Sequence, residues 1–193
     1  DDEEALIFDG QGWYGGDVNK LWIKAEAEYS FEGEELEEAE VQALWSRAIS
    51  PYFDLQAGVR YDLEPKGRTH AVIGVQGLAP YWFEVDAAAF VSTQGDVTAR
   101  IEAEYELLLT QRLVLQPRVE ASLSAQDIPA LQIGSGLTNV DAGLRLRYEV
   151  VREFAPYIGV EWKNAIGDTA DLIEASGGDA NSTAVLIGVR TWF

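Results

Sequence analysis

The sequence has no cysteine and no methionine, and it has a single histidine. Thiolate, thioether and imidazole groups are the donors that soft and borderline metal ions prefer, so most soft metal ligands are absent. Basic residues are also scarce, since 14 Lys and Arg stand against 33 Asp and Glu and the formal net charge is -19. This balance excludes a nucleic-acid-binding protein, because neutralising phosphates requires clustered Lys and Arg.

Long apolar runs are missing too. No stretch of the sequence approaches the roughly 18 apolar residues of a membrane-spanning helix. Hydrophobic residues nevertheless make up 47% of the 193 residues, which is too many for a disordered acidic chain. The chain begins with Asp1 rather than Met and shows no signal peptide, so we expect that its front end has been processed or cut.

Apolar and polar residues alternate with a period of two along most of the chain. Between Leu21 and Phe31 the odd positions are apolar or aromatic, and the even positions include Lys24, Glu26 and Glu28. Successive side chains of a β-strand point to opposite faces, so this alternation predicts strands with one apolar and one polar face. The pattern recurs at 53–61, 83–91, 99–107, 113–123, 142–150 and 185–193.

The length of these segments distinguishes two architectures, a soluble sheet with one wet face and a membrane barrel with a wet lumen. Strands of soluble proteins usually have about 5–6 residues. A tilted strand needs about 9–11 residues to cross a bilayer, and these segments are at least roughly that long. The predicted fold class is therefore all-β, an antiparallel up-and-down transmembrane β-barrel whose apolar faces contact the lipid of the bacterial outer membrane.

Eleven strands are predicted, within a single barrel domain over 1–193. Such barrels have an even number of strands, so we expect one further strand upstream and twelve in the complete barrel. Short turns alternate with longer polar links, and we assign the short turns to the periplasmic side. The segment 34–48 also contains helix formers, but strand alternation and the up-down order favour a strand there. The predicted strands are 5–15, 19–31, 37–48, 52–62, 69–78, 82–92, 97–108, 112–125, 137–150, 154–166 and 182–193.

Aromatic residues gather beside the short turns, and a sparser set lies toward the long links. Two rings of Trp and Tyr are expected where a barrel crosses the two headgroup layers. The sparser set comprises Tyr29, Phe31, Tyr61, Phe90 and Trp162.

The polar faces carry acidic and basic residues together. Such mixed ladders suit a narrow hydrated lumen, in which long side chains from facing walls meet and block much of the interior. The predicted lumen-lining residues are Glu26, Glu28, Arg60, Arg100, Glu102, Glu104, Arg118, Glu120, Arg145, Arg147 and Glu149.

Two local patterns could carry chemistry. Gly10, Gly12 and Gly15 spell GxGxxG, but a strand pattern surrounds them, so turn-side glycines explain them better than a dinucleotide site. His70 lies beside Thr69 and is the single imidazole, which makes it the candidate general base if the barrel is a hydrolase or acyltransferase. The alternative is a polar residue at a strand end, and we predict that the protein is not an enzyme.

Acidic loops are the other candidate sites, because oxygen-rich clusters suit hard divalent cations and raise the local cation concentration. The alternative interpretation is a solvated loop. The weak metal-ligand candidates, together with the imidazole, are His70, Glu34, Glu35, Asp168, Asp171 and Asp179.

Five segments carry a more specific pattern: 15–28 (GGDVNKLWIKAEAE), 75–92 (VQGLAPYWFEVDAAAFVS), 104–117 (EYELLLTQRLVLQP), 143–162 (GLRLRYEVVREFAPYIGVEW) and the ending VRTWF. Together these segments resemble the copper resistance protein B family of outer-membrane proteins.

The resemblance implies a twelve-stranded outer-membrane barrel that acts in copper passage or sequestration. It also implies copper ions as cargo and a periplasmic copper oxidase or carrier of the same system as a partner. Family members carry a Met- and His-rich segment before the barrel, and this sequence lacks one. A structural or adhesive barrel is a further alternative.

Overall fold

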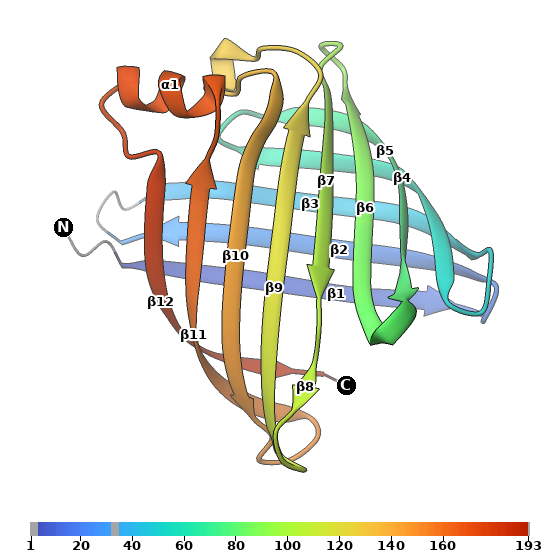
Figure 1. The fold of residues 1–193 in the computed structure, drawn as a ribbon. Helices are drawn as coiled ribbons and strands as arrows, with labels where there is room; N and C mark the ends of the chain where they lie inside the picture. The colour runs from blue at the N-terminus through green and yellow to red at the C-terminus, as the bar shows by residue number, and fades with distance from the viewer. Residues whose placement is uncertain (1–3, 32–34, 193) are drawn as a thin grey trace. The chain divides into compact units, whose positions relative to one another are not determined.

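The computed structural model describes residues 4–31 and 35–192, which form antiparallel β-strands in a meander (Figure 1). They fall into two compact units: unit 1 is Asp1–Gln76 and Ala88–Thr98, and unit 2 is Gly77–Ala87 and Ala99–Phe193. The strands are β1 (Ala5–Gly15), β2 (Asn19–Ser30), β3 (Glu35–Ala48), β4 (Phe53–Glu64), β5 (Arg68–Ala79), β6 (Phe83–Ser92), β7 (Val97–Glu104), β8 (Leu107–Leu108), β9 (Leu113–Ser124), β10 (Gly136–Tyr148), β11 (Phe154–Ala165) and β12 (Asn181–Thr191).

Strand order follows chain order, from β1 to β7 and then from β9 to β12, with the short β8 paired to β9. The described residues therefore contain the eleven predicted strands on one hydrogen-bonded path, and the predicted fold class is confirmed. The expected single domain and upstream strand stay predictions.

The strand predicted over 97–108 is interrupted, and this part of the prediction is wrong. It is divided into β7 and β8 at Tyr105 and Glu106. The backbone N–H of Tyr105 donates to the carbonyl of Pro117 on β9 at 3.1 Å. Proline has no N–H, so Pro117 cannot donate the second hydrogen bond of this residue pair to the Tyr105 carbonyl, and the ladder breaks at this position.

Side-chain exposure in unit 1 shows an inverted arrangement of polar and apolar residues. On β3 the even-numbered Glu40 and Gln42 are 2% and 5% exposed, whereas the odd-numbered Val41 and Trp45 are 43% and 47% exposed. The segment that could have been helical is thus a strand with its polar side chains inside. In a membrane barrel the exposed apolar face is the one that contacts lipid.

An apolar cluster interrupts the polar interior of unit 1. Leu44, Val72 and Phe90 are buried together, and Trp22 packs against them. The assignment of Phe90 to an outer aromatic ring is therefore wrong. Successive side chains of a strand point to opposite faces. The neighbours of Phe90 at odd positions point outward, so Phe90, at an even position, points inward.

Gly58 on β4 lets β3 and β4 approach closely beside this cluster. It lies opposite Leu44 in the β3–β4 register. A Cβ atom at Gly58 would clash with the carbonyl oxygen of Ala43 and would lie only 2.8 Å from the Leu44 Cα. The two strands can approach this closely only with glycine at this position.

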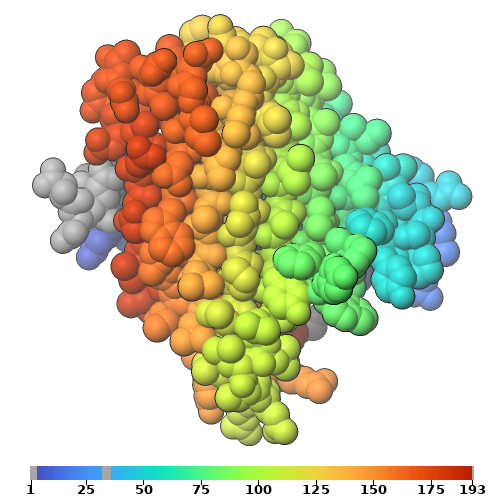
Figure 2. All heavy atoms as spheres, viewed as in Figure 1, coloured from blue at the N-terminus to red at the C-terminus, as the bar shows by residue number. Residues whose placement is uncertain are grey.

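Unit 2 contains the helix α1 (Asp168–Ala175), which lies with the β9–β10 loop at the same end of β9, β10 and β11, away from β8 (Figure 1). The sequence predicted only a polar link over 167–182, so the helix was missed. In the space-filling view the yellow-green segment around β8 projects as a knob from the other end of these strands (Figure 2). Nowhere in 4–31 and 35–192 is a helix long and apolar enough to cross a membrane.

The turn between β5 and β6 has an unusual backbone. It is a single 3-10 turn, Pro80–Trp82, in which Tyr81 and Trp82 have φ angles of 68° and 67°. This left-handed region is unfavourable for residues other than glycine. Both aromatic side chains project outward, with 84% and 70% of their surfaces exposed.

Candidate functional site: paired charges on the polar strand faces

Arg118 on β9 is the centre of a charge cluster in unit 2. Its guanidinium donates to Glu102 at 2.9 Å, to Glu120 at 2.6 Å and to Glu161 at 3.4 Å. Arg100 Nε lies 3.4 Å from Glu120 Oε1. The cluster therefore joins four of the predicted lumen-lining residues with one glutamate, Glu161, that was not on that list.

Gly143 explains how Arg118 reaches Glu161 across an intervening strand. In the register, Gly143 of β10 lies between Arg118 of β9 and Glu161 of β11. An ideal Cβ at Gly143 would lie 3.8 Å from the Arg118 Cβ. A longer side chain at position 143 would therefore occupy the space between Arg118 and Glu161. A glycine in this row thus permits an ion pair between second-neighbour strands.

A second cluster in unit 2 surrounds Arg147. Its guanidinium donates to Glu106 at 2.9 Å and to the Gln116 side chain at 3.4 Å, and lies 3.6 Å from Glu149. Only 4% of the Arg147 side chain is exposed. Gln116 in turn donates to Glu104. Removing Arg147 from water is favourable only with such partners, because an isolated buried charge is very costly.

Two other arginines complete the charged face of unit 2. Arg190 on β12 lies 3.8 Å from Glu104 and 3.7 Å from Glu106. The Arg145 guanidinium lies over the Tyr157 ring, 5.6 Å from its centroid. Glu106 therefore lies close to guanidiniums from both β10 and β12.

The predicted lumen residues of unit 1 lie on β2 and β4. Glu26 and Glu28 are half-buried on β2, opposite Glu40 and Glu38 of β3 in the register. Arg60 on β4 contacts Glu40 at 2.7 Å and Asp62 at 2.5 Å, and its guanidinium lies 5.0 Å from the centre of the Phe90 ring. Arg60 therefore holds two buried carboxylates on adjacent strands.

His70 on β5 lies next to the Arg60 cluster. Its Nδ1 is 3.6 Å from Asp62 Oδ2, and only 9% of the His70 side chain is exposed. This Nδ1 atom has no hydrogen-bond partner. The neighbouring Arg68 contacts Asp96 at 2.5 Å, and the Ser92 hydroxyl donates to the same carboxylate at 3.1 Å. His70 is thus a buried residue within a charged network.

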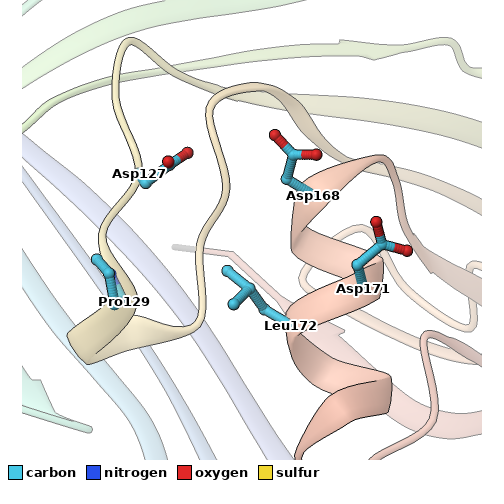
Figure 3. A pocket seen from close by; sticks show the side chains of 5 residues that line it. All are labelled: Asp127, Pro129, Asp168, Asp171 and Leu172. Carbon is cyan, nitrogen blue, oxygen red and sulfur yellow. The ribbon is translucent and has the colours of Figure 1, made fainter.

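Of the acidic loop candidates, Asp168 and Asp171, both on α1, line one cavity together. The cavity has a volume of about 270 Å³ and is also lined by Asp127, Pro129 and Leu172 (Figure 3). Beside the cavity, the Thr169 hydroxyl of α1 accepts the Gly134 N–H at 2.9 Å and so joins the helix to the β9–β10 loop. Asp179 is exposed beyond the helix. Glu34 lies outside the described residues, and Glu35 begins β3.

No group of three or more potential His, Cys, Asp or Glu ligands is arranged for a metal ion in the ranges 4–31 and 35–192. In Figure 3 Asp168 and Asp171 come from α1 and Asp127 comes from the β9–β10 loop, where its carboxylate accepts the Ser135 N–H at 2.8 Å. The structure thus brings the lumen candidates into contact with counter-charges more extensively than it does the loop candidates.

The list of predicted lumen-lining residues left out several members of the charge clusters, namely Glu40, Asp62, Asp96, Glu106, Glu161 and Arg190. Most continue the alternation of their strands, so they share a face with residues that were named. Asp62, for example, is two residues from Arg60, and Glu106 is two from Glu104. The period of two was a sufficient signal for these two residues.

Inverted exposure, long antiparallel strands and paired interior charges together define an outer-membrane β-barrel. The fold is similar to that of a solved NanC porin, with a TM-score of 0.66 and 11% identity over 99% of this chain and 96% of that one. A KdgM porin matches with a TM-score of 0.56 and 10% identity over 99% and 98% of the two chains.

The family model described as copper resistance protein B precursor matches residues 1–193. Copper resistance protein B of Escherichia coli is 47% identical over 182 residues, which cover 94% of this chain and 61% of that protein. A copper resistance protein B homolog of Pseudomonas syringae pv. tomato (strain ATCC BAA-871 / DC3000) is 42% identical over 193 residues, or 100% and 65% of the two chains.

The chain belongs to the copper resistance protein B family, and its fold is that of an outer-membrane β-barrel. It spans less than two thirds of the length of these two relatives. The resemblance seen in the sequence is therefore confirmed at the level of the family.

Proposed function

We propose that this barrel lets copper ions pass, or holds them, at the outer membrane without making or breaking covalent bonds. The observation that carries the proposal is the acidic character of the charged strand faces. In unit 2 alone, Arg100, Arg118, Arg147 and Arg190 are paired with at least six glutamates. Faces with more carboxylates than guanidiniums concentrate cations and disfavour anions.

The available donors restrict how copper is handled. Without Cys and Met the chain offers no soft ligand, so Cu(I) has little to bind. Carboxylates bind Cu(II) weakly and exchange it quickly, which suits passage because an ion must be able to leave each site. Specific capture of copper and transfer to a periplasmic copper oxidase or carrier would then involve other parts of the system.

A hydrolase or acyltransferase is the second function considered. It would require a nucleophile hydrogen-bonded to the His70 imidazole. The Ser92 hydroxyl instead donates to Asp96, and His70 Nδ1 faces Asp62. This arrangement favours a charged lumen over catalysis. A structural or adhesive barrel has no need of buried charge clusters, which are costly to assemble.

Liposomes that contain a copper-quenched dye test the proposal. Liposomes with the refolded protein should admit Cu(II) faster than protein-free liposomes. The double variant Glu102→Gln, Glu161→Gln should slow entry, while Arg118 keeps Glu120 as a partner. The exposed turn residue Glu153 provides the control, since Glu153→Gln should leave the rate unchanged. Equal copper entry with and without the protein, combined with unchanged copper accumulation in cells that lack it, would refute the proposal.

A further inference from the structure

We infer that His70 and Asp62 together form a weak Cu(II) site on the polar face of β4 and β5. The inference rests on the proposed function, because copper is the cargo that makes such a site useful. His70 is the single imidazole of the chain, and no Cys or Met competes with it. It is therefore the one side chain whose chemistry distinguishes copper from hard cations such as Ca²⁺.

The contact between these two residues is incomplete as it stands. His70 Nδ1 and Asp62 Oδ2 are 3.6 Å apart, beyond the roughly 2.7–3.2 Å of an N–H···O hydrogen bond. If Nδ1 carries a proton, a buried donor lacks an acceptor. If Nδ1 is deprotonated, its lone pair faces an oxygen that can only accept. In either form Nδ1 has no partner, which is costly for a buried polar atom.

A single divalent ion would satisfy both atoms. Transition-metal bonds to imidazole nitrogen and carboxylate oxygen are about 2.0–2.2 Å long. An ion bonded to both atoms could therefore lie between them at their present separation, with a bond angle of roughly 120°. Cu(II) prefers tetragonal geometry with neighbouring bonds at about 90°, so a small rotation of the His70 or Asp62 side chain would complete the contact without movement of β4 against β5.

The surroundings hold Asp62 in the orientation that this site needs. Arg60 Nε donates to Asp62 Oδ1 at 2.5 Å, which leaves Oδ2 turned toward His70. Fixing a ligand through its second oxygen is how outer hydrogen bonds tune metal sites. Arg60 also contacts Glu40, so the site does not face an uncompensated guanidinium.

Arg68, the other cation nearby, is compensated as well, because Asp96 lies 2.5 Å from it. With a neutral imidazole, the charged groups around the site are the cations Arg60 and Arg68 and the anions Glu40, Asp62 and Asp96. The five charges sum to one negative charge, which is compatible with binding a divalent cation. With only two protein donors the affinity is low, as an ion in transit requires.

Pulsed electron paramagnetic resonance on the untagged 193-residue chain in detergent tests the site. One equivalent of Cu(II) should show the modulation from the remote nitrogen of a bound imidazole, and excess Ca²⁺ should not remove it. His70→Asn should abolish this modulation, and Asp62→Asn should weaken Cu(II) binding about tenfold or more. Asp54→Asn is the control, because Asp54 pairs with Lys20 elsewhere in unit 1.

Circular dichroism and the mobility of unheated samples in gels show whether each variant is folded, and His70→Gln provides a second substitution if His70→Asn fails to fold. A folded wild-type chain that binds Cu(II) without imidazole modulation would overturn the inference, even if copper still enters liposomes. Imidazole modulation without copper entry would instead support this site and refute the proposed function. The two ideas can therefore fail separately.

Discussion

Replacing Arg118 with Gln should destabilise the folded barrel strongly. The change removes the shared partner of Glu102, Glu120 and Glu161, whose oxygens lie 2.6 to 3.4 Å from the guanidinium. Loss of one member of a buried charge cluster costs about 3–5 kcal/mol. The lower end applies here because 24% of the Arg118 side chain is exposed. About 3 kcal/mol corresponds to a decrease of roughly a hundredfold in the folding equilibrium constant.

Urea unfolding in lipid vesicles, followed by circular dichroism, measures this effect. A loss of about 3 kcal/mol should lower the urea midpoint by roughly 1–3 M for an ordinary urea dependence. Arg152→Gln, in the exposed turn before β11, is the matched control and should stay within about 0.5 kcal/mol of wild type. Adding Glu161→Gln to the Arg118 variant should restore part of the stability, because it removes a carboxylate that has lost its arginine partner. Equal midpoints for Arg118→Gln and Arg152→Gln would refute the clustered-charge interpretation.

Four further predictions concern the lipid face, the strand contact, copper binding and the lumen. Ile158→Arg, at an exposed position of β11, should cost about 2–4 kcal/mol in refolding titrations into lipid, and a cost equal to that of Ile158→Val would contradict the outward assignment. Gly58→Ala should push β3 away from β4 and lower the unfolding midpoint, whereas Ala57→Gly next to it should have a smaller effect. Calorimetry should show no Cu(I) binding and weak Cu(II) binding to the chain, and planar bilayers should show no large, steady, unselective currents.

Strand positions were predictable because alternation with a period of two is a strong signal over ten or more residues. β1 was predicted at its observed bounds, and most other strands within one or two residues. The break after Glu104 was not predicted, since it depends on Pro117, which lies on another strand. Which residues face each other across a sheet is not contained in the pattern of a single strand.

The side chains of the charge clusters were predictable in kind but not in pairing. The alternation places Arg118 and Glu120 on one face, whereas the contact with Glu161 requires the β9–β10–β11 register and the glycine at position 143. Phe90 was placed in an outer aromatic ring because it is aromatic and lies near a predicted strand end. Its even position in the alternation would have placed it inside. Helix α1 was missed because eight residues between polar links give too short a periodic signal.

The turn at Tyr81 and Trp82 implies a trade between folding and membrane attachment. Each of these residues in the left-handed region costs about 1–2 kcal/mol, which an Asn-Gly pair would avoid in a two-residue turn. The sequence instead keeps two exposed amphipathic rings, the side chains most favoured at the headgroup layer. A double variant that combines Tyr81→Asn with Trp82→Gly should close this hairpin faster and yet hold its depth in the bilayer less firmly. The two residues that raise the free energy of this turn are therefore the same two whose rings suit the headgroup layer.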